Sequence, residues 1–233
     1  AGRQREDLAV RLHQGEADPG PLLAAARRVE LRAAQVDRDG RGPGSGQPGG
    51  EVGGPGTGAL YDLGSHLIDQ AITLFGMPKS VWADIRVIRR DSIVDDYFEL
   101  VFYYDHLRAR VKCNYLVREA LPAYQLHGRT GSFIKTKSDI QEAQLQRGLM
   151  PDSPDWGAEA PHEWGLLHTE IDGKVVKKFV PGGHGNYMDY YQGVYEALVN
   201  KAANPVPPED AIKVIRIIEA AFKSSKEGRV VDL

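Results

Sequence analysis

The residues best suited to acid–base chemistry in this sequence are an aspartate and a histidine four positions apart, Asp62 and His66. Residues four apart on a helix stack on one face, and Asp69, three residues after His66, falls on nearly the same face. An imidazole exchanges a proton near neutral pH, and a carboxylate one turn away can orient the ring or bind a substrate hydroxyl. The pattern predicts that Asp62 and His66 form a catalytic pair and that Asp69 contacts the substrate.

Spacing alone leaves three other interpretations of these residues open. Acid–histidine pairs are common on exposed helix surfaces, and Asp62 is also a suitable helix N-cap residue. A metal site built from Asp62, His66 and Asp69 is the third, but zinc sites commonly use more histidines, and no second histidine lies at helical spacing. The other histidines are scattered through expected strands and loops and form no recognisable set.

Several polar and aromatic groups in expected loops and at strand ends could contact a polyhydroxylated ligand, because such segments commonly carry binding residues. Ordinary packing of the aromatic rings and a solvated arginine are the simpler alternatives for each of them. The predicted substrate contacts, besides Asp69, are Arg118, Trp156, Asn186 and Tyr187; Trp164 lies in the same long loop as Trp156.

The elements that position these residues read as an α+β domain. Leu63, Leu67, Ile68 and Ile72 recur at helical spacing and predict a helix over residues 62–75, which Gly76 and Pro78 end. Alternating apolar patterns follow, and an Asp-Gly pair between the last two is typical of a hairpin turn. The expected strands are residues 81–87, 97–104, 108–117, 123–128, 131–136, 166–171 and 174–180.

Two helical patterns and a short apolar run close the chain. The helices are expected over residues 187–200 and 208–226, and residues 229–233 are expected to return to the sheet as a strand. In the second helix the apolar stripe is expected to consist of Ile212, Ile215, Ile218 and Phe222.

The predicted architecture is one large, open, mostly antiparallel sheet with helices packed on one face. Its other face must be solvated or paired. Residues 97–104 carry aromatic and aliphatic side chains on both alternations, so both faces of this strand are expected to be buried. We therefore expect a homo-oligomer that forms through the open sheet.

The composition changes abruptly near residue 57. Residues 1–57 contain no Lys, Ile, Phe, Tyr, Trp, Met, Asn or Cys, and residues 37–57 are of low complexity. This segment has too few apolar residues to offset the entropy of ordering, so we expect disorder there, although a weak helical pattern runs over residues 22–36. The segment is interpreted either as a natural disordered tail or as a non-native reading frame joined to a genuine domain at residues 58–233, which sequencing the transcript across codons 50–60 would decide.

The whole-chain composition excludes some partners and sites. A formal net charge of −3 and a pI near 6.2 provide no broad basic field for nucleic acid. The single cysteine, Cys113, rules out an internal disulfide and multi-cysteine metal sites and suits a reducing cytoplasm. No apolar run is long enough to cross a membrane, and no signal pattern is present at the N-terminus, so a cytoplasmic location with no membrane partner is expected.

An ordered series of segments resembles the C-terminal domain of the Gfo/Idh/MocA oxidoreductases, and most closely the NADP-dependent scyllo-inositol dehydrogenase type. The resemblance covers nearly all of residues 58–233. Its segments are GALYDLGSHLIDQAITLFGMP, DDYFELVFYY, LHGRTGSFIK, DIQEAQL, DWGAE, GNYMDYYQGVYEAL and VIRIIEAAFKSS.

The resemblance implies roles for individual residues. Members of this family have an N-terminal Rossmann domain that holds NAD or NADP and a C-terminal α+β domain whose open sheet pairs with another subunit. The family's Asp-x-x-x-His motif falls on Asp62 and His66. By resemblance, His66 would take the hydroxyl proton as hydride leaves the carbon of a sugar or polyol, and Asp62 would position the hydroxyl or the histidine.

The chain departs from the family pattern in its first 57 residues. The glycine fingerprint of a Rossmann domain follows a strand and opens a helix, and the glycine-rich stretch of residues 40–50 fits neither condition. The family's Glu-Lys-Pro segment is also missing. We therefore expect the Rossmann domain to be absent, no NAD(P) to be bound and no activity from this chain alone. The alternative is a noncatalytic dimerisation domain, and the sequence identifies neither the sugar or polyol nor the choice between NAD and NADP.

Overall fold

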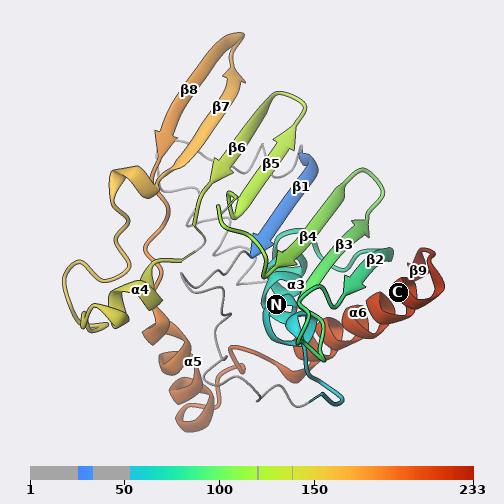
Figure 1. Ribbon diagram of the computed structural model, residues 1–233. Coiled ribbons are helices and arrows are strands. Elements are labelled where there is room, and N and C mark those ends of the chain that lie inside the picture. The colour runs from blue at the N-terminus through green and yellow to red at the C-terminus, as the bar shows by residue number, and fades with distance from the viewer. Residues whose placement is uncertain (1–25, 34–52, 120, 138) are drawn as a thin grey trace.

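The computed structural model describes residues 26–33, 53–119, 121–137 and 139–233. Its nine strands form one sheet in the order β8-β7-β6-β5-β1-β4-β3-β2-β9 (Figure 1). The strands are β1 Ala26–Ala33, β2 Ser80–Arg86, β3 Tyr97–Tyr103, β4 Arg108–Asn114, β5 Tyr124–Gly128, β6 Gly131–Lys135, β7 Gly165–Ile171, β8 Lys174–Val180 and β9 Val231–Asp232.

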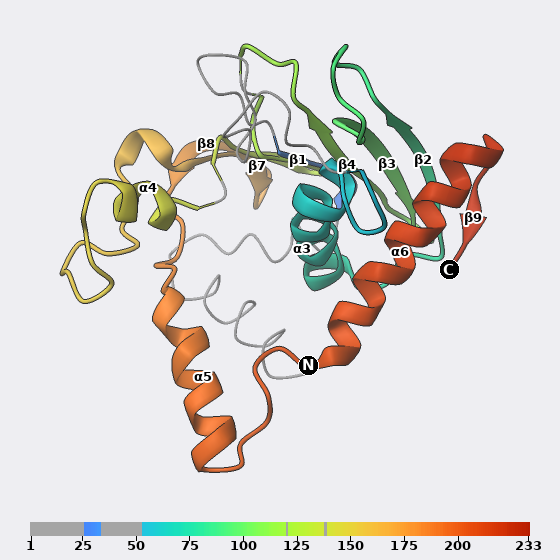
Figure 2. The ribbon, with the colours of Figure 1, turned by 60° about the horizontal axis from the view of Figure 1, so that its bottom comes forward.

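Within the described ranges, every strand pairing is antiparallel except that of β1 with β4. The helices lie on one side of this sheet (Figure 2). The predicted α+β fold with an open, mostly antiparallel sheet is therefore confirmed. The helical elements are a π-helical turn η1 Leu60–Gly64, α3 Ser65–Phe75, α4 Gln141–Gln146, a 3-10 turn η2 Pro161–Glu163, α5 Tyr187–Val199 and α6 Pro208–Glu227.

The weak helical pattern of the first segment does not correspond to a helix where the structure describes it. Ala26–Ala33 form β1, which lies between β4 and β5 in the middle of the sheet. Val29 and Leu31 alternate with charged residues, a period-two pattern that a neighbouring strand on each side can stabilise. The rest of residues 1–52 lies outside the described residues, and the domain boundary after residue 57 stays a prediction.

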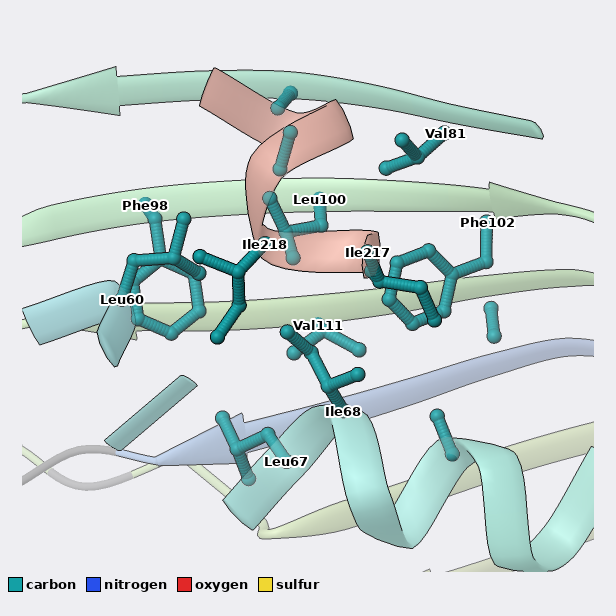
Figure 3. Close-up of a cluster of buried hydrophobic side chains, with 14 of the residues drawn as sticks. Leu60, Leu67, Ile68, Val81, Phe98, Leu100, Phe102, Val111, Ile217 and Ile218 are labelled. Carbon is teal, nitrogen blue, oxygen red and sulfur yellow. The ribbon is translucent and has the colours of Figure 1, made fainter. Parts of the chain in front are cut away.

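The core lies between the sheet and the helices α3 and α6. On β3 and β4 alternate residues are fully buried on the helical side, as the two-residue period of a strand requires. Figure 3 shows how these side chains meet those of the helices. The fully buried side chains of this cluster include Leu60, Ile68, Val81, Phe98, Leu100, Phe102, Val111, Ile217 and Ile218.

Two connections close the sheet edge at β2. The predicted C-terminal strand exists as β9 and pairs with the first two residues of β2. Beyond that short pairing, the hydroxyls of Ser224 and Ser225 in α6 accept hydrogen bonds from the backbone N–H groups of Ala83 and Ile85. This edge is therefore satisfied by a helix rather than left open for another strand.

The apolar stripe of α6 differs from the predicted one. Ile218 is buried as expected, but Ile212 and Ile215 are exposed, and Val214 and Ile217 face the sheet in their place. Isoleucines recur along this helix on more than one face, so periodicity did not decide which face packs against β2. The contact of α6 with β2 and α3 decides it.

The correction predicts unequal stabilities for two isoleucine variants of one helix. Ile218→Ala is expected to lower the free energy of unfolding by about 2–5 kcal/mol, since Ile218 is fully buried and leaves a cavity. Ile215→Ala is expected to change it by about 0.5 kcal/mol or less, because Ile215 is 42% exposed. Urea unfolding followed by circular dichroism measures both, and losses of similar size would contradict this helix register.

Candidate active site

The helix that carries Asp62 and His66 is fixed to the sheet at its first turn. The Asp95 carboxylate accepts a hydrogen bond from the backbone N–H of Leu60 at 2.7 Å, and the Asp95 carbonyl accepts one from Ala59 at 2.7 Å. Gly58 has a φ of +99°, and a Cβ there would lie 2.0 Å from the Asp95 carboxylate. The chain can therefore enter this helix only by way of a glycine.

A second glycine lets the helix approach the sheet closely. Gly64 is buried, and a Cβ at this position would lie 2.6 Å from Leu60 and 3.2 Å from the Phe98 ring. The chain is π-helical up to Gly64 and α-helical from Ser65, where the predicted helix was continuous. Such single π turns inside helices are frequent at functional sites.

This docking leaves the predicted catalytic residues on the outer face of the helix. Leu67 and Ile68 are buried against the sheet, while Asp62, His66 and Asp69 are exposed. All three polar side chains are therefore available to a ligand or to a further domain that approaches the helical side of the sheet.

Electrostatic effects link this face to its neighbours. Partial burial and the carboxylate of Asp210 in α6 raise the pKa of Asp69, which His66 opposes. Burial, with the Cys113 thiol and the Asp62 carboxylate, raises the pKa of Tyr115 to about 12. A tyrosine that follows β4 thus lies within the electrostatic reach of Asp62. Sequence reasoning missed Tyr115, since its nearness to Asp62 depends on how the helix crosses the sheet.

The lone cysteine is not a candidate nucleophile. Cys113 is fully buried in the core on β4. Burial and the charge of Asp62 raise the pKa of its thiol to about 12, so the reactive thiolate form is suppressed.

Three of the predicted substrate contacts form a second group at the start of α5. The Tyr187 ring lies edge-on to the Trp156 ring with centroids 6.1 Å apart, and the Tyr187 hydroxyl donates to Asp139 at 2.7 Å. Asn186 is the N-cap residue of α5, because its side-chain oxygen accepts from the backbone N–H of Met188. The sequence interpretation missed both this cap and the contribution of Asp139.

The second group is not an open aromatic platform. Trp156 is buried, and its indole Nε1 has no hydrogen-bond partner among the described residues. Tyr187 is partly exposed, and Gln141 accepts from its backbone N–H at 2.8 Å. Burial, the hydrogen bond to Asp139 and the charge of that carboxylate raise the pKa of Tyr187 to about 12.

A buried ion pair holds the loops that surround this second group. Lys135 at the end of β6 contacts Glu159 at 2.5 Å, and both side chains are nearly inaccessible to solvent. The other oxygen of Glu159 accepts from the backbone N–H of Gly182 at 3.0 Å, while Lys135 donates to the Glu163 carbonyl. The pair therefore ties the sheet to the segment that leads into α5.

The structure thus distributes the predicted site residues over two groups. Asp62, His66 and Asp69 share the outer face of η1 and α3, and Trp156, Asn186 and Tyr187 meet at the start of α5. The two helices lie apart in both views (Figures 1 and 2). Arg118 is exposed four residues after β4 ends, beyond Tyr115.

The described residues contain neither a typical metal-binding group nor a typical dinucleotide-binding loop. They contain no group of three or more His, Cys, Asp or Glu side chains arranged to hold a metal ion. They also lack a glycine-rich loop between a parallel strand and a helix, which is the usual cradle for a dinucleotide pyrophosphate. In the ranges with described coordinates, no helix has the length and apolarity needed to span a membrane.

Comparison with known proteins identifies this arrangement. The family model described as "Oxidoreductase family, C-terminal alpha/beta domain" matches residues 47–233. The chain belongs to the Gfo/Idh/MocA oxidoreductases. The family resemblance of the sequence is therefore confirmed, and members of this family use NAD(P).

Curated relatives of the Gfo/Idh/MocA family share about half their length with this chain. One is the scyllo-inositol 2-dehydrogenase (NADP(+)) IolW of Bacillus subtilis (strain 168), 43% identical over 77% of this chain and 50% of its own length. Another is the uncharacterized oxidoreductase YdgJ of Escherichia coli (strain K12), 37% identical over 76% of this chain and 50% of its own.

Solved structures of oxidoreductases have the same fold. The Bacillus subtilis protein yvaA has a TM-score of 0.81 and 37% identity, over 91% of this chain and 59% of its own. An oxidoreductase from Bacillus cereus has a TM-score of 0.79 and 31% identity, over 98% of this chain and 63% of its own.

The contact between Tyr187 and Asp139 predicts a pH-dependent stability difference. Burial raises the pKa of Asp139, but hydrogen bonds from Tyr187 and Gln141 outweigh it and lower this pKa below the ordinary 3.8. A lowered carboxyl pKa contributes stability that is present above the unfolded-state pKa and is lost as the pH falls through the folded-state pKa. Tyr187→Phe is therefore expected to cost at most about 1 kcal/mol at pH 7, since Asp139 is exposed, and less at an acid pH below the folded-state pKa of Asp139.

Urea unfolding at the two pH values measures this difference. Tyr191→Phe is the matched control, because the ring of Tyr191 is exposed on the same helix. A Tyr187→Phe loss that is equal at both pH values would show that the hydroxyl does not stabilise the Asp139 carboxylate.

Proposed function

We propose that this chain is the substrate-binding and dimerising half of an NAD(P)-dependent oxidoreductase that acts on a CH–OH group of a sugar or polyol. The observation that supports this most is the exposure of Asp62 and His66 on a helix fixed to the sheet, in a chain that belongs to the Gfo/Idh/MocA family. Kinship with a scyllo-inositol 2-dehydrogenase favours an inositol-like substrate.

In this proposal the chain's own residues bind the substrate and move its hydroxyl proton. His66 accepts the proton from the substrate oxygen as the carbon is oxidised, because an imidazole is an effective base near neutral pH. Asp62, one turn earlier and exposed on the same face, orients the imidazole or accepts a hydrogen bond from the hydroxyl. Bound NAD(P) supplies the hydride acceptor in this chemistry.

Asp69 and the polar groups near α5 are proposed to bind the remaining hydroxyls of the substrate. Asp69 is exposed one turn beyond His66, and Arg118 is exposed beyond the end of β4. Trp156, Asn186 and Tyr187 belong to the second group, whose loops are held by the buried Lys135–Glu159 pair.

We propose that two copies pair through the sheet face that carries no helices. On that face Glu99 pairs with Lys112 at 3.3 Å and with Arg110 at 3.8 Å. The Arg108 guanidinium lies over the Tyr103 ring. These residues form a surface of aromatic rings and paired charges. The same surface supports the alternative function, a noncatalytic dimerisation domain derived from such an enzyme.

The chain alone is expected to bind neither NADPH nor NADH, because its described residues provide no cradle for the pyrophosphate. Titration with each coenzyme, followed by coenzyme fluorescence at protein concentrations well above micromolar, measures this. Saturable binding would mean that this chain builds a coenzyme site of its own.

A chimera tests the catalytic assignment directly. The full chain, which includes the central strand β1, replaces the matched half of the Bacillus subtilis scyllo-inositol 2-dehydrogenase, and NADP reduction is measured with scyllo-inositol. In an active chimera, His66→Ala is expected to lower kcat about a hundredfold to ten-thousandfold, because the general base is removed.

The exposed His168 of β7 provides the control, since His168→Ala leaves the proposed base in place. Equal rates for the two variants would refute the role of His66. A chimera that binds NADPH without turnover would favour the noncatalytic alternative.

A further inference from the structure

Asp95, which lies just before β3, supplies the acceptor that the start of the helix with Asp62 and His66 needs. The first N–H groups of a helix have no partner within the helix, so another group must accept from them. The N-cap residue of η1 is Ala59, whose methyl side chain cannot accept a hydrogen bond. The Asp95 carboxylate, from a distant part of the chain, accepts from Leu60 instead. This contact therefore both caps the helix and ties its first turn to the sheet.

Water cannot replace the hydrogen bond that Leu60 donates. Leu60 is fully buried, and Figure 3 shows its side chain beside the Phe98 ring. A buried backbone N–H almost always has an acceptor, because leaving it without one is costly. If the Asp95 carboxylate were removed, the first turn would have to move until this N–H found another acceptor.

Such a movement would displace Asp62 more than His66. Asp62 belongs to η1, the turn that Asp95 holds, whereas His66 belongs to α3. The next two residues of α3, Leu67 and Ile68, are buried in the core and hold that helix against the sheet without help from Asp95. The distance between the two proposed catalytic side chains therefore depends on Asp95.

The neighbouring Asp96 keeps the loop itself in place. Asp96 is fully buried, and its carboxylate accepts from the backbone N–H groups of Ile88 at 2.7 Å and Arg89 at 3.0 Å, and from the Arg89 side chain at 2.8 Å. These contacts lie within the connection between β2 and β3. Loss of the Asp95 carboxylate is therefore expected to leave that connection intact, so that its effect falls on the helix start.

We infer that Asp95 is a positioning residue for the oxidation, because by accepting from the Leu60 N–H it sets the place of Asp62 relative to His66. This inference rests on the proposed function, since it concerns the same site. In this role Asp95 acts only through the helix and transfers no proton itself. A catalytic group that is misplaced by about 1 Å can cost about a hundredfold in rate, so such an anchor matters for catalysis.

The role requires an acceptor oxygen rather than a charge. Burial raises the pKa of Asp95, although hydrogen bonds from Leu60 and Ala59 oppose this shift. A raised carboxyl pKa means that the folded protein disfavours the charged form relative to water. The amide of Asp95→Asn is neutral and keeps one oxygen for the Leu60 N–H, whereas Asp95→Ala has none. We therefore expect Asp95→Asn to retain the position of Asp62 and Asp95→Ala to lose it.

Amide hydrogen exchange of the full chain, followed residue by residue by NMR, tests the anchor without any catalysis. Asp95→Ala is expected to speed exchange of the Leu60 amide about tenfold or more, while that of Ile68 changes less than about twofold. Asp95→Asn is expected to stay within about threefold of the unchanged chain at Leu60. Equal exchange at Leu60 in all three proteins would overturn the inference, because the turn would then not depend on Asp95.

Kinetics of the chimera with the Bacillus subtilis scyllo-inositol 2-dehydrogenase test the consequence. Asp95→Ala is expected to lower kcat about tenfold to a hundredfold and to leave the dissociation constant of NADPH within about twofold, and Asp95→Asn is expected to restore kcat. Ser225→Ala is the matched control. The Ser225 hydroxyl also accepts from a backbone N–H, that of Ile85, but at the sheet edge, so kcat is expected to change less than about twofold.

A double-mutant cycle separates positioning from general destabilisation. If Asp95 acts through Asp62, Asp95→Ala lowers kcat much less in an Asp62→Ala background, because the group that it positions is then absent. An unchanged kcat in Asp95→Ala, an equal loss in both backgrounds, or a loss that Asp95→Asn does not reverse would overturn the inference. Full activity of both Asp62→Ala and His66→Ala would contradict the proposed function instead, and exchange at Leu60 would still report whether Asp95 anchors the turn.

Discussion

Burial of one face of a single sheet against two helices is the constraint on which the rest of this structure depends. The side chains of β3 and β4 that point toward α3 and α6 are fully buried, and residues of the helices and of β2 complete the core around them. Area removed from water is the main favourable contribution to folding, so these contacts determine where the helices lie. Leu126 of β5 still belongs to this core, and Phe133 of β6 packs against it. The loops that lead from the far half of the sheet to α5 are tied by the Lys135–Glu159 ion pair.

The candidate site is a consequence of that packing. Because Leu67 and Ile68 must face the sheet, Asp62 and His66 must face away from it, and Gly64 allows the approach that makes this possible. The anchoring of the first turn by Asp95 then fixes where the exposed pair stands. The outer face of this helix is available for chemistry because its inner face is committed to the core.

The polar contacts of the other half have a different physical basis. A buried ion pair requires hydrogen bonds to its remaining donors and acceptors, and Lys135 and Glu159 find them in the backbone of Glu163 and Gly182. Such a pair specifies geometry more than it adds stability. The pair therefore fixes the segment that leads into α5, a helix whose apolar side chains Tyr191, Tyr195 and Leu198 are exposed.

The sequence by itself determined the elements whose signal is local. Two-residue alternation predicted the strands β2 to β8. The Asp172-Gly173 pair predicted the turn of the β7–β8 hairpin, because both residue types tolerate the positive φ angles found there. Helical spacing predicted that Asp62 and His66 share one face. The tertiary structure alone decided what depends on distant partners. These are the strand β1, which needs a neighbour on each side, the face of α6 that packs, the burial of Trp156, and the nearness of Tyr115 to Asp62. Periodicity shows that a face is apolar, but only the packed neighbours determine whether that face is covered.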